Sequence, residues 1–302
     1  MTAQTLPRRG KRILCTGRLY CDLVLGGMGA PPTPGQEVYA QSLVLAAGGG
    51  AYITAAYLAA LGREAGLAAI IPAEPFAGPI AAELAEAEID LGACTYAPPG
   101  LDPQITVALV TGGDRAFVTR RCGPALPEGL QELLGRKQYD HLHIGELASL
   151  IDAPQIVAQA KSAGMSVSLD CAWDAEVLAR GDLPALVRGV DVFLPNQIEA
   201  DALARHGPVP QYAPVVVVKK GAEGAEAYAN GSRFECPAVP VTVVDTVGAG
   251  DAFNAGFLDR WLEGESLADC LDAGAKVASL ALMRHGGALG LGRLARPRAA
   301  TD

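Results

Sequence analysis

Short runs of apolar residues alternate along this chain with longer segments, rich in alanine and leucine, whose apolar positions recur at helical spacing. The short runs predict buried strands, because a strand that is covered on both faces has no polar side. They fall at 13–16, 68–71, 141–144, 166–170, 190–194 and 215–218. The longer segments predict helices at 50–61, 79–87, 154–163, 198–206, 252–262 and 267–282. This alternation favours βαβ units, which build a mostly parallel sheet with helices on both faces.

Four further segments interrupt this rhythm and have the composition of strands without helices between them. They fall at 19–25, 37–44, 104–111 and 115–121. The last two flank the sequence Thr111-Gly112-Gly113-Asp114, which is a hairpin turn signal. We therefore expect a small antiparallel sheet beside the main one, built from residues of about 19–44 and 104–121.

Composition sets the outer bounds on organisation and partners. Half of the 302 residues are hydrophobic, which suits a single domain over residues 1–302 with one large core. The formal net charge of −9, with scattered Lys and Arg, offers no basic stripe to a nucleic acid. No apolar run approaches the roughly 18 residues of a membrane span, and no signal peptide pattern is present. Seven cysteines without a CxxC pair indicate reduced thiols and a cytoplasmic location.

The stretch VDTVGAGDAF at 244–253 carries the strongest chemical signal. Gly248 and Gly250 permit backbone angles that a side chain would forbid, so successive N–H groups can point at one anion. The helix that follows would add its free amide donors and the positive end of its dipole. Asp251, in this position, either caps the helix or takes the proton from a hydroxyl that attacks a phosphoryl group.

The string DTVGAGDAFNAGF resembles the second signature of the ribokinase-like (PfkB) family of carbohydrate and nucleoside kinases. That family has DTxGAGD before an apolar helix. The resemblance implies a three-layer α/β/α sandwich with a small β lid over the substrate, a lid that often pairs two subunits. It also implies that Asp251 is the catalytic base. The backbone of Gly248, Ala249 and Gly250 would then form the anion hole for the transferred phosphoryl group.

A second motif, GGGAYITA at 48–55, continues into Leu61-Gly62. Taken alone, it favours a flexible turn from a strand into a helix. It nevertheless resembles the first signature of the same family, GGxxxNxAxxxAxLG, which assigns Gly48 and Gly49 to the acceptor substrate. The Asn of that signature falls on Ile53 in this chain, and Tyr52 precedes it.

Asp22 follows the first predicted strand, where a lone Asp is usually solvated. The resemblance makes it the carboxylate that accepts hydrogen bonds from two substrate hydroxyls, a task that suits paired oxygens. Positions that are Asn, Lys and Asn in the ribokinase pattern are Tyr20, Gly50 and Ile53 here. We therefore expect free ribose to be a poor acceptor, and expect Tyr20 and Tyr52 to form walls of the acceptor pocket.

Asn196 and Glu199 directly follow the predicted strand at 190–194, where they could form a capping box for the next helix. They also resemble the family's NxxE motif, which holds hydrated Mg²⁺ and the nucleotide phosphates. Because Mg²⁺ keeps most of its waters, a single Glu that acts through water is adequate. The resemblance further places Asp245 and Thr246 near a monovalent-cation site, and leaves open whether K⁺ binds there.

The apolar run that ends in Lys219 leads into a glycine turn, and ligands of open α/β sheets bind beyond such strand ends. The resemblance implies that Lys219, Gly221 and Gly224 line the ATP site. On the adenine side it implies Gly287 and Lys276, the latter standing where the family often has Asn.

The sequence thus predicts an ATP- and Mg²⁺-dependent kinase that phosphorylates a hydroxyl of a small sugar, sugar acid or nucleoside and forms a homodimer through the lid. We expect no nucleic-acid or membrane partner. Two alternatives stay open: a non-catalytic protein of the same fold that senses a sugar or nucleotide, and a kinase of a vitamin-type heterocycle such as hydroxymethylpyrimidine or pyridoxal. His141 and His143 alternate on a predicted strand, but without a third ligand they favour buried neutral histidines over a zinc site.

Overall fold

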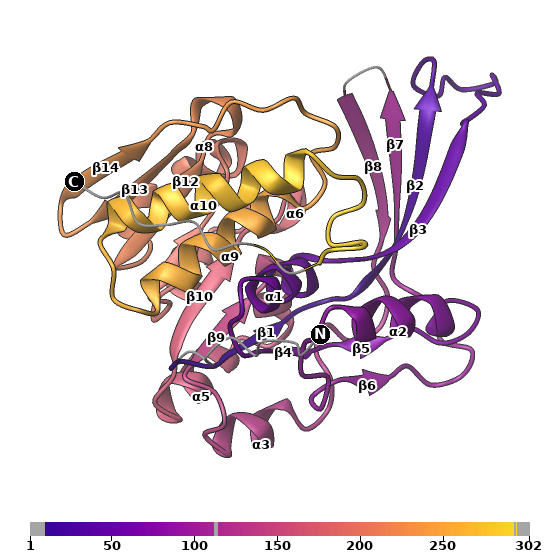
Figure 1. The fold of residues 1–302 in the computed structure, drawn as a ribbon. Helices are drawn as coiled ribbons and strands as arrows, with labels where there is room; N and C mark the ends of the chain where they lie inside the picture. Colours follow the sequence, from indigo (N-terminus) through magenta and orange to yellow (C-terminus); the bar gives the residue numbers. More distant parts are fainter. Residues whose placement is uncertain (1–9, 112–113, 293, 295–302) are drawn as a thin grey trace, which may run out of the picture.

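An eight-stranded sheet forms the middle layer of the computed structural model, which describes residues 10–111, 114–292 and 294 (Figure 1). Its strands run in the order β14-β13-β12-β11-β10-β9-β1-β4. The parallel part comprises β12 (Val215–Lys219), β11 (Val192–Leu194), β10 (Ser166–Asp170), β9 (His141–Ile144), β1 (Ile13–Thr16) and β4 (Ala65–Ala68). The hairpin of β13 (Ala225–Ala229) and β14 (Ser232–Cys236) adds an antiparallel edge.

Helices cover both faces of this sheet, because successive residues of each strand point to opposite sides. Ile13 and Cys15 of β1 pack in one core with α1 (Gly50–Ala60), α9 (Ala249–Trp261) and α10 (Leu267–Leu282). Leu14 lies in a second core on the other face. That face is covered by the shorter helices α3 (Leu130–Gly135), α4 (Leu147–Asp152), α5 (Ile156–Ser162), α6 (Ala175–Leu178), α7 (Leu183–Leu186) and α8 (Gln197–Leu203). The predicted three-layer α/β/α sandwich is confirmed.

The lid is a four-stranded sheet that projects from the main body (Figure 1). It has the order β3 (Ser42–Gly48), β2 (Tyr20–Met28), β7 (Ile105–Thr111) and β8 (Asp114–Arg120). The pairs β2/β3 and β7/β8 are antiparallel as expected, whereas β2 and β7 pair in parallel. The strand predicted at 37–44 lies at Ser42–Gly48 instead, because the Ala- and Gly-rich end pairs with β2. The predicted turn at Gly112-Gly113 lies outside the described residues.

The strand predicted at 68–71 also differs from the observed sheet, and the difference has a tertiary cause. The strand predicted at 68–71 is divided between β4 and β5 (Ile70–Ile71), and β5 pairs with β6 (Thr95–Tyr96) in a separate small sheet. β4 includes Gly66, which looks like a strand breaker. A Cβ there would lie 2.4 Å from the hydroxyl of Tyr139, so the glycine is required by packing.

The β13/β14 hairpin was missed because its first strand, AEAYA, has the composition of a helix. Its turn is Asn230-Gly231, and both residues have positive φ, as a two-residue hairpin turn requires. That Asn-Gly dipeptide was the signal in the sequence that could have predicted the hairpin.

The remaining helix α2 (Ala77–Glu86) lies close to its predicted position. Within the described part of the chain, none of the helices has the length and apolarity needed to cross a membrane.

Candidate active site

The carboxyl ends of the parallel strands meet the N-terminus of α9 at one edge of the main sheet. Lys219 ends β12, and its ammonium lies 3.6 Å from the place where a Cβ on Gly250 would stand. Asp251 lies against the start of α1, because a Cβ on Gly50 would come within 2.8 Å of its Oδ1. The two glycine motifs of the sequence, which start 200 residues apart at Gly48 and Gly248, thus meet at this edge.

Helix α9 begins at Ala249, three residues earlier than predicted, so the Gly-Ala-Gly segment belongs to its first turn. Its N-cap is Gly248, with φ of 73°, a left-handed conformation that favours glycine. A Cβ at Gly248 would also lie 3.1 Å from the Cα of Gly287 and from Ile53 Cγ2. First-turn amides have no intrahelical acceptor, and no described side chain caps this helix. The segment therefore has the geometry of an anion cradle.

Asp251 occupies the third position of α9 rather than the N-cap, and makes no capping hydrogen bond among the described residues. The capping alternative is therefore wrong. Burial and the charge of Asp170 raise its pKa to about 7, Glu199 and Asp22 add to that rise, and Lys219 opposes it. A carboxylate that titrates near neutral pH beside an anion cradle can serve as a general base.

Asn196 and Glu199 form the capping box of α8. Glu199 N donates to Asn196 Oδ1 at 2.9 Å, and Asn196 N donates to Glu199 Oε2 at 2.7 Å. Burial and the charge of Asp170 raise the pKa of Glu199 to about 7. The structural role of the motif is thus confirmed. Among the described residues, this capping box engages one oxygen of the Glu199 carboxylate, Oε2.

The described residues contain no group of three or more His, Cys, Asp or Glu side chains arranged to hold a metal ion. The buried carboxylate of Glu199 still fits Mg²⁺. This ion is commonly held by substrate phosphates, waters and one or two carboxylates. Asp245 instead joins two loops, because its Oδ1 accepts from Val247 N at 2.9 Å and its Oδ2 from Gly286 N at 3.0 Å. The backbone carbonyl of Thr246 accepts from Ala249 N at 3.3 Å.

At the acceptor end, Asp22 lies on β2 directly against Gly48. A Cβ on Gly48 would stand 2.1 Å from Asp22 Oδ2, and one on Gly49 would stand 2.3 Å from the carbonyl oxygen of Arg18. Glycine is therefore needed at both positions because other groups lie close to the backbone there, and not only because the turn is flexible. Burial and the nearby charge of Glu83 raise the pKa of Asp22 to about 7.

The two tyrosines that were expected to form pocket walls have different surroundings. Tyr20 is 8% exposed and its hydroxyl donates to Glu146 Oε2 at 3.1 Å, at the base of the lid. Tyr52 is 1% exposed and its hydroxyl donates to Glu83 Oε1 at 3.1 Å, in the core between α1 and α2. The expected role of Tyr52 as a pocket wall is therefore not supported.

Ile53 also faces protein rather than open space. It is 3% exposed and packs against Gly248 and Gly287, which lie on the two loops around the anion cradle. The family's Asn position therefore carries a side chain that supports these loops by apolar contact. No hydrogen bond to an acceptor substrate is available from it.

The nucleotide-side residues lie on several elements. Gly221 and Gly224 both have positive φ, and a Cβ on Gly224 would meet Cys236 O at 2.0 Å. Lys276, on α10, forms an ion pair with Asp272 at 2.6 Å. Gly287 accepts at its carbonyl from the hydroxyl of Tyr57 at 3.3 Å.

His141 and His143 lie on β9 and make a hydrogen-bonded row with the serines of β10. The row joins Ser166 Oγ to His141 Nδ1 at 2.7 Å, and Ser168 Oγ to His141 Nε2 at 2.7 Å and to His143 Nδ1 at 2.8 Å. Burial lowers the pKa of His143 to about 4. Both are buried, and the prediction of neutral histidines is confirmed.

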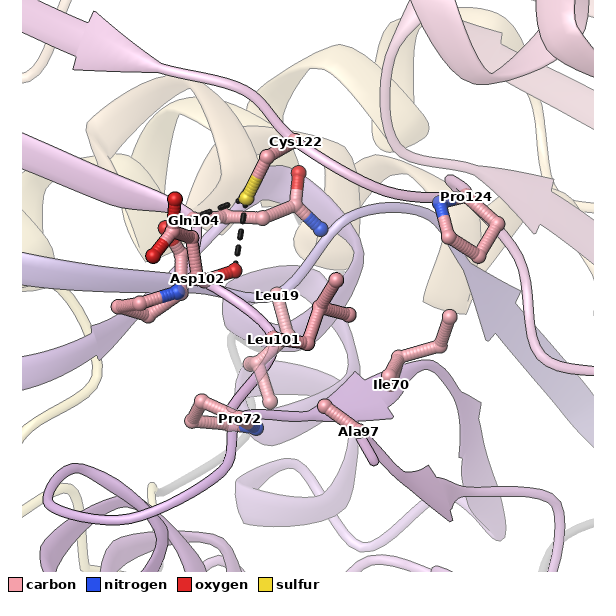
Figure 2. Close-up of a pocket in the computed structure, with 10 residues that line it drawn as sticks. Leu19, Ile70, Pro72, Ala97, Leu101, Asp102, Gln104, Cys122 and Pro124 are labelled. Carbon is pink, nitrogen blue, oxygen red and sulfur yellow. Dashed lines mark hydrogen bonds between the residues drawn. The ribbon is translucent and has the colours of Figure 1, made fainter. Parts of the chain in front are cut away.

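Figure 2 shows a separate small pocket at the base of the lid. Cys122 donates from Sγ to the carbonyl oxygens of Asp102 at 2.7 Å and Pro103 at 3.4 Å. None of the predicted site residues lines this pocket. It is lined by Leu19, Ile70, Pro72, Ala97, Leu101, Asp102, Pro103, Gln104, Cys122 and Pro124.

Sequence reasoning missed two residues of the candidate site. Asp170 is the last residue of β10, and Asn254 lies one turn after Asp251 on α9. Both contact Lys219. The signal for Asp170 was its place at the carboxyl end of a predicted strand, where ligands of open α/β sheets bind.

A carboxylate beside an amide cradle, at the carboxyl edge of a parallel sheet and next to a β lid, is the arrangement of a phosphotransferase. The chain belongs to the pfkB family of carbohydrate kinases, whose profile matches residues 11–291. It is therefore a kinase, as the sequence predicted.

Individual relatives agree with this assignment. An uncharacterized sugar kinase of Archaeoglobus fulgidus is 31% identical over 52% of this chain and 66% of its own length. An ATP-dependent ribose-1-phosphate kinase of Halopiger xanaduensis is 28% identical over 91% of this chain and 93% of its own. The structure of Arabidopsis thaliana ribokinase, solved with ribose and ATP, has a TM-score of 0.76 at 20% identity. The superposition covers 93% of this chain and 95% of the ribokinase chain.

Proposed function

We propose that this protein transfers the γ-phosphoryl group of ATP to a hydroxyl of a small sugar, sugar acid or nucleoside, with Asp251 as the general base. The observation that carries the proposal is the position of Asp251, with its pKa raised to about 7, at the first turn of α9. A residue in this place can remove a proton from a hydroxyl that attacks an anion bound by the cradle.

In the proposed step, the acceptor hydroxyl gives its proton to Asp251 as its oxygen forms a bond to the γ-phosphorus. The bond from that phosphorus to the bridging oxygen breaks, and ADP leaves. The amides around Gly248, Ala249 and Gly250 donate to the phosphoryl oxygens as charge develops on them. Mg²⁺, held by the phosphates and through water by Glu199, would neutralise phosphate charge.

The acceptor would bind beneath the lid, with Asp22 as the acceptor of two hydroxyl hydrogen bonds and Gly48 and Gly49 as the floor. Lys219, Gly221, Gly224, Asn196, Lys276 and Gly287 would line the nucleotide side. Asp245 and Thr246 stay candidates for a monovalent-cation site. The presence of a lid favours a sugar-type kinase over a vitamin-type kinase.

We also propose a homodimer that forms through the lid. Leu43, Phe117 and Val118 of the lid strands are 64%, 49% and 63% exposed. The register places Leu43 and Val118 on one face of this sheet and Phe117 on the other, because neighbouring residues of a strand point to opposite sides. The exposed apolar pair on the first face would be buried against a partner. All seven cysteines are free thiols, which supports a reducing, cytoplasmic location.

The test is ATP turnover against a panel of sugars, sugar acids and nucleosides, followed as ADP formation and by identification of the phosphorylated product. We expect acceptor-dependent ADP formation with at least one member, and ribose is included as the expected poor acceptor. A protein that binds ATP and a panel member, yet forms no product with any of them, would instead be the non-catalytic sensor.

A further inference from the structure

Three side chains from three elements form a closed polar cluster beside the anion cradle. Lys219 Nζ donates to Asp170 Oδ1 at 2.9 Å and to Asn254 Oδ1 at 3.1 Å. Asn254 Nδ2 donates to Asp170 Oδ2 at 2.6 Å. Each member thus contacts the other two, and the ammonium is held from both a strand end and a helix.

The cluster is buried, so its geometry is costly to change. Asp170 is 6% exposed and Asn254 is fully buried. The backbone N–H of Cys171 donates a further hydrogen bond to Asp170 Oδ1 at 2.8 Å. A buried polar group that loses its partner destabilises the fold, and the effect is larger when the group is charged. The favoured position of the Lys219 ammonium is therefore the one that these contacts define.

That position lies at the cradle. The ammonium stands close to Gly250, and the charges of Asp170, Glu199 and Asp251 keep the pKa of Lys219 raised despite the opposing effect of burial. A lysine that was free to move could pair directly with Asp251 and neutralise the base. Asp170 and Asn254 hold the ammonium by hydrogen bonds at the place beside Gly250, where it can face an anion bound by the α9 amides.

We propose that Asp170 and Asn254 are positioning residues, which hold the Lys219 ammonium against the phosphoryl group during transfer. This inference rests on the proposed kinase function. It adds a positively charged donor, the Lys219 ammonium, to the α9 amides of the anion hole. It also gives a place in the reaction to Asp170, which lies outside both glycine motifs, and to Asn254, which lies within the second.

A double-mutant cycle tests whether Asp170 acts through Lys219. The proteins are the parent, Asp170→Asn, Lys219→Met and the double variant, each measured for kcat and for the dissociation constant of Mg·AMP-PNP. We expect Lys219→Met to lower kcat by about 10²–10³, the effect of losing one donor at an oxyanion hole. Asp170→Asn should lower kcat by about tenfold or more, and the double variant should lie within about threefold of Lys219→Met.

Additive losses in kcat and in nucleotide affinity would overturn the proposal, because Asp170 would then act independently of Lys219. Asp182→Asn makes the same chemical change at a surface ion pair with Arg180 and should leave both quantities unchanged. If Asp170→Asn does not fold, Asn254→Ala enters the same cycle. If the parent transfers no phosphoryl group to any acceptor, the proposed function fails, and the nucleotide dissociation constants still decide whether the cluster acts as a unit.

Discussion

Asp251→Asn should abolish most catalysis and, above neutral pH, stabilise the fold. The substitution keeps the shape of the side chain and removes its basicity. Loss of a general base typically costs about 10²–10⁴ in rate. Nucleotide and acceptor should still bind, because the amides of the cradle and the carboxylate of Asp22 are unchanged.

The stability effect follows from the raised pKa of Asp251, which moves from an ordinary 3.8 to about 7 in the folded protein. A raised carboxyl pKa means that the folded state prefers the protonated group. The contribution of Asp251 to the free energy of unfolding is therefore fully present below about pH 4, and it is lost as the pH rises through about 7. One pKa unit corresponds to about 1.4 kcal/mol, so a shift of this size sets an upper bound of about 4 kcal/mol. We expect the variant to gain about 1–3 kcal/mol at pH 8 and almost nothing at pH 4.

The assay combines kcat/KM as a function of pH with urea unfolding at pH 4 and pH 8. The parent should lose activity by about tenfold per pH unit below pH 7, as the base becomes protonated. Asp182→Asn serves as the matched control, because Asp182 is an exposed Asp whose ion pair is with Arg180 on the surface. A variant with more than half of the parental kcat, or one destabilised at pH 8, would refute the reasoning.

Three further predictions test other parts of the structure. Glu199→Gln should raise the Mg²⁺ concentration needed for half-maximal rate, because one charge near the hydrated ion is lost; an unchanged titration would leave Glu199 only its capping role. Gly48→Ala should displace Asp22 and lower kcat/KM for the acceptor by about 10–100-fold, or roughly 1–3 kcal/mol. The dissociation constant of the nucleotide should stay the same, and equal losses for both substrates would contradict this prediction. Arg63→Met breaks the buried ion pair in which Arg63 Nε lies 2.8 Å from Asp259 Oδ1. It should lower the free energy of unfolding, measured by urea titration, by about 3–5 kcal/mol. A loss below about 1 kcal/mol would show that the pair is energetically neutral.

Much of the fold could be predicted from the sequence because buried parallel strands are continuous apolar runs. β1, β9 and β10 lie at their predicted residues. β3 and β4 do not, since their ends depend on which strand lies beside them. Gly66 illustrates the limit: the sequence shows a breaker, and only the hydroxyl of Tyr139 explains why glycine belongs in that strand.

The candidate site divides in the same way. The sequence by itself determined the anion cradle and Asp251, because a glycine-rich turn before an apolar helix is a local pattern. Only the tertiary structure brought Asp170 and Asn254 to Lys219, placed Tyr52 in the core, and set Gly48 against Asp22. These contacts join residues far apart in the chain, and such approach depends on strand order and helix packing. A backbone conformation can be encoded by a few neighbouring residues, whereas a buried charge and its partners are defined only when the whole sheet is assembled.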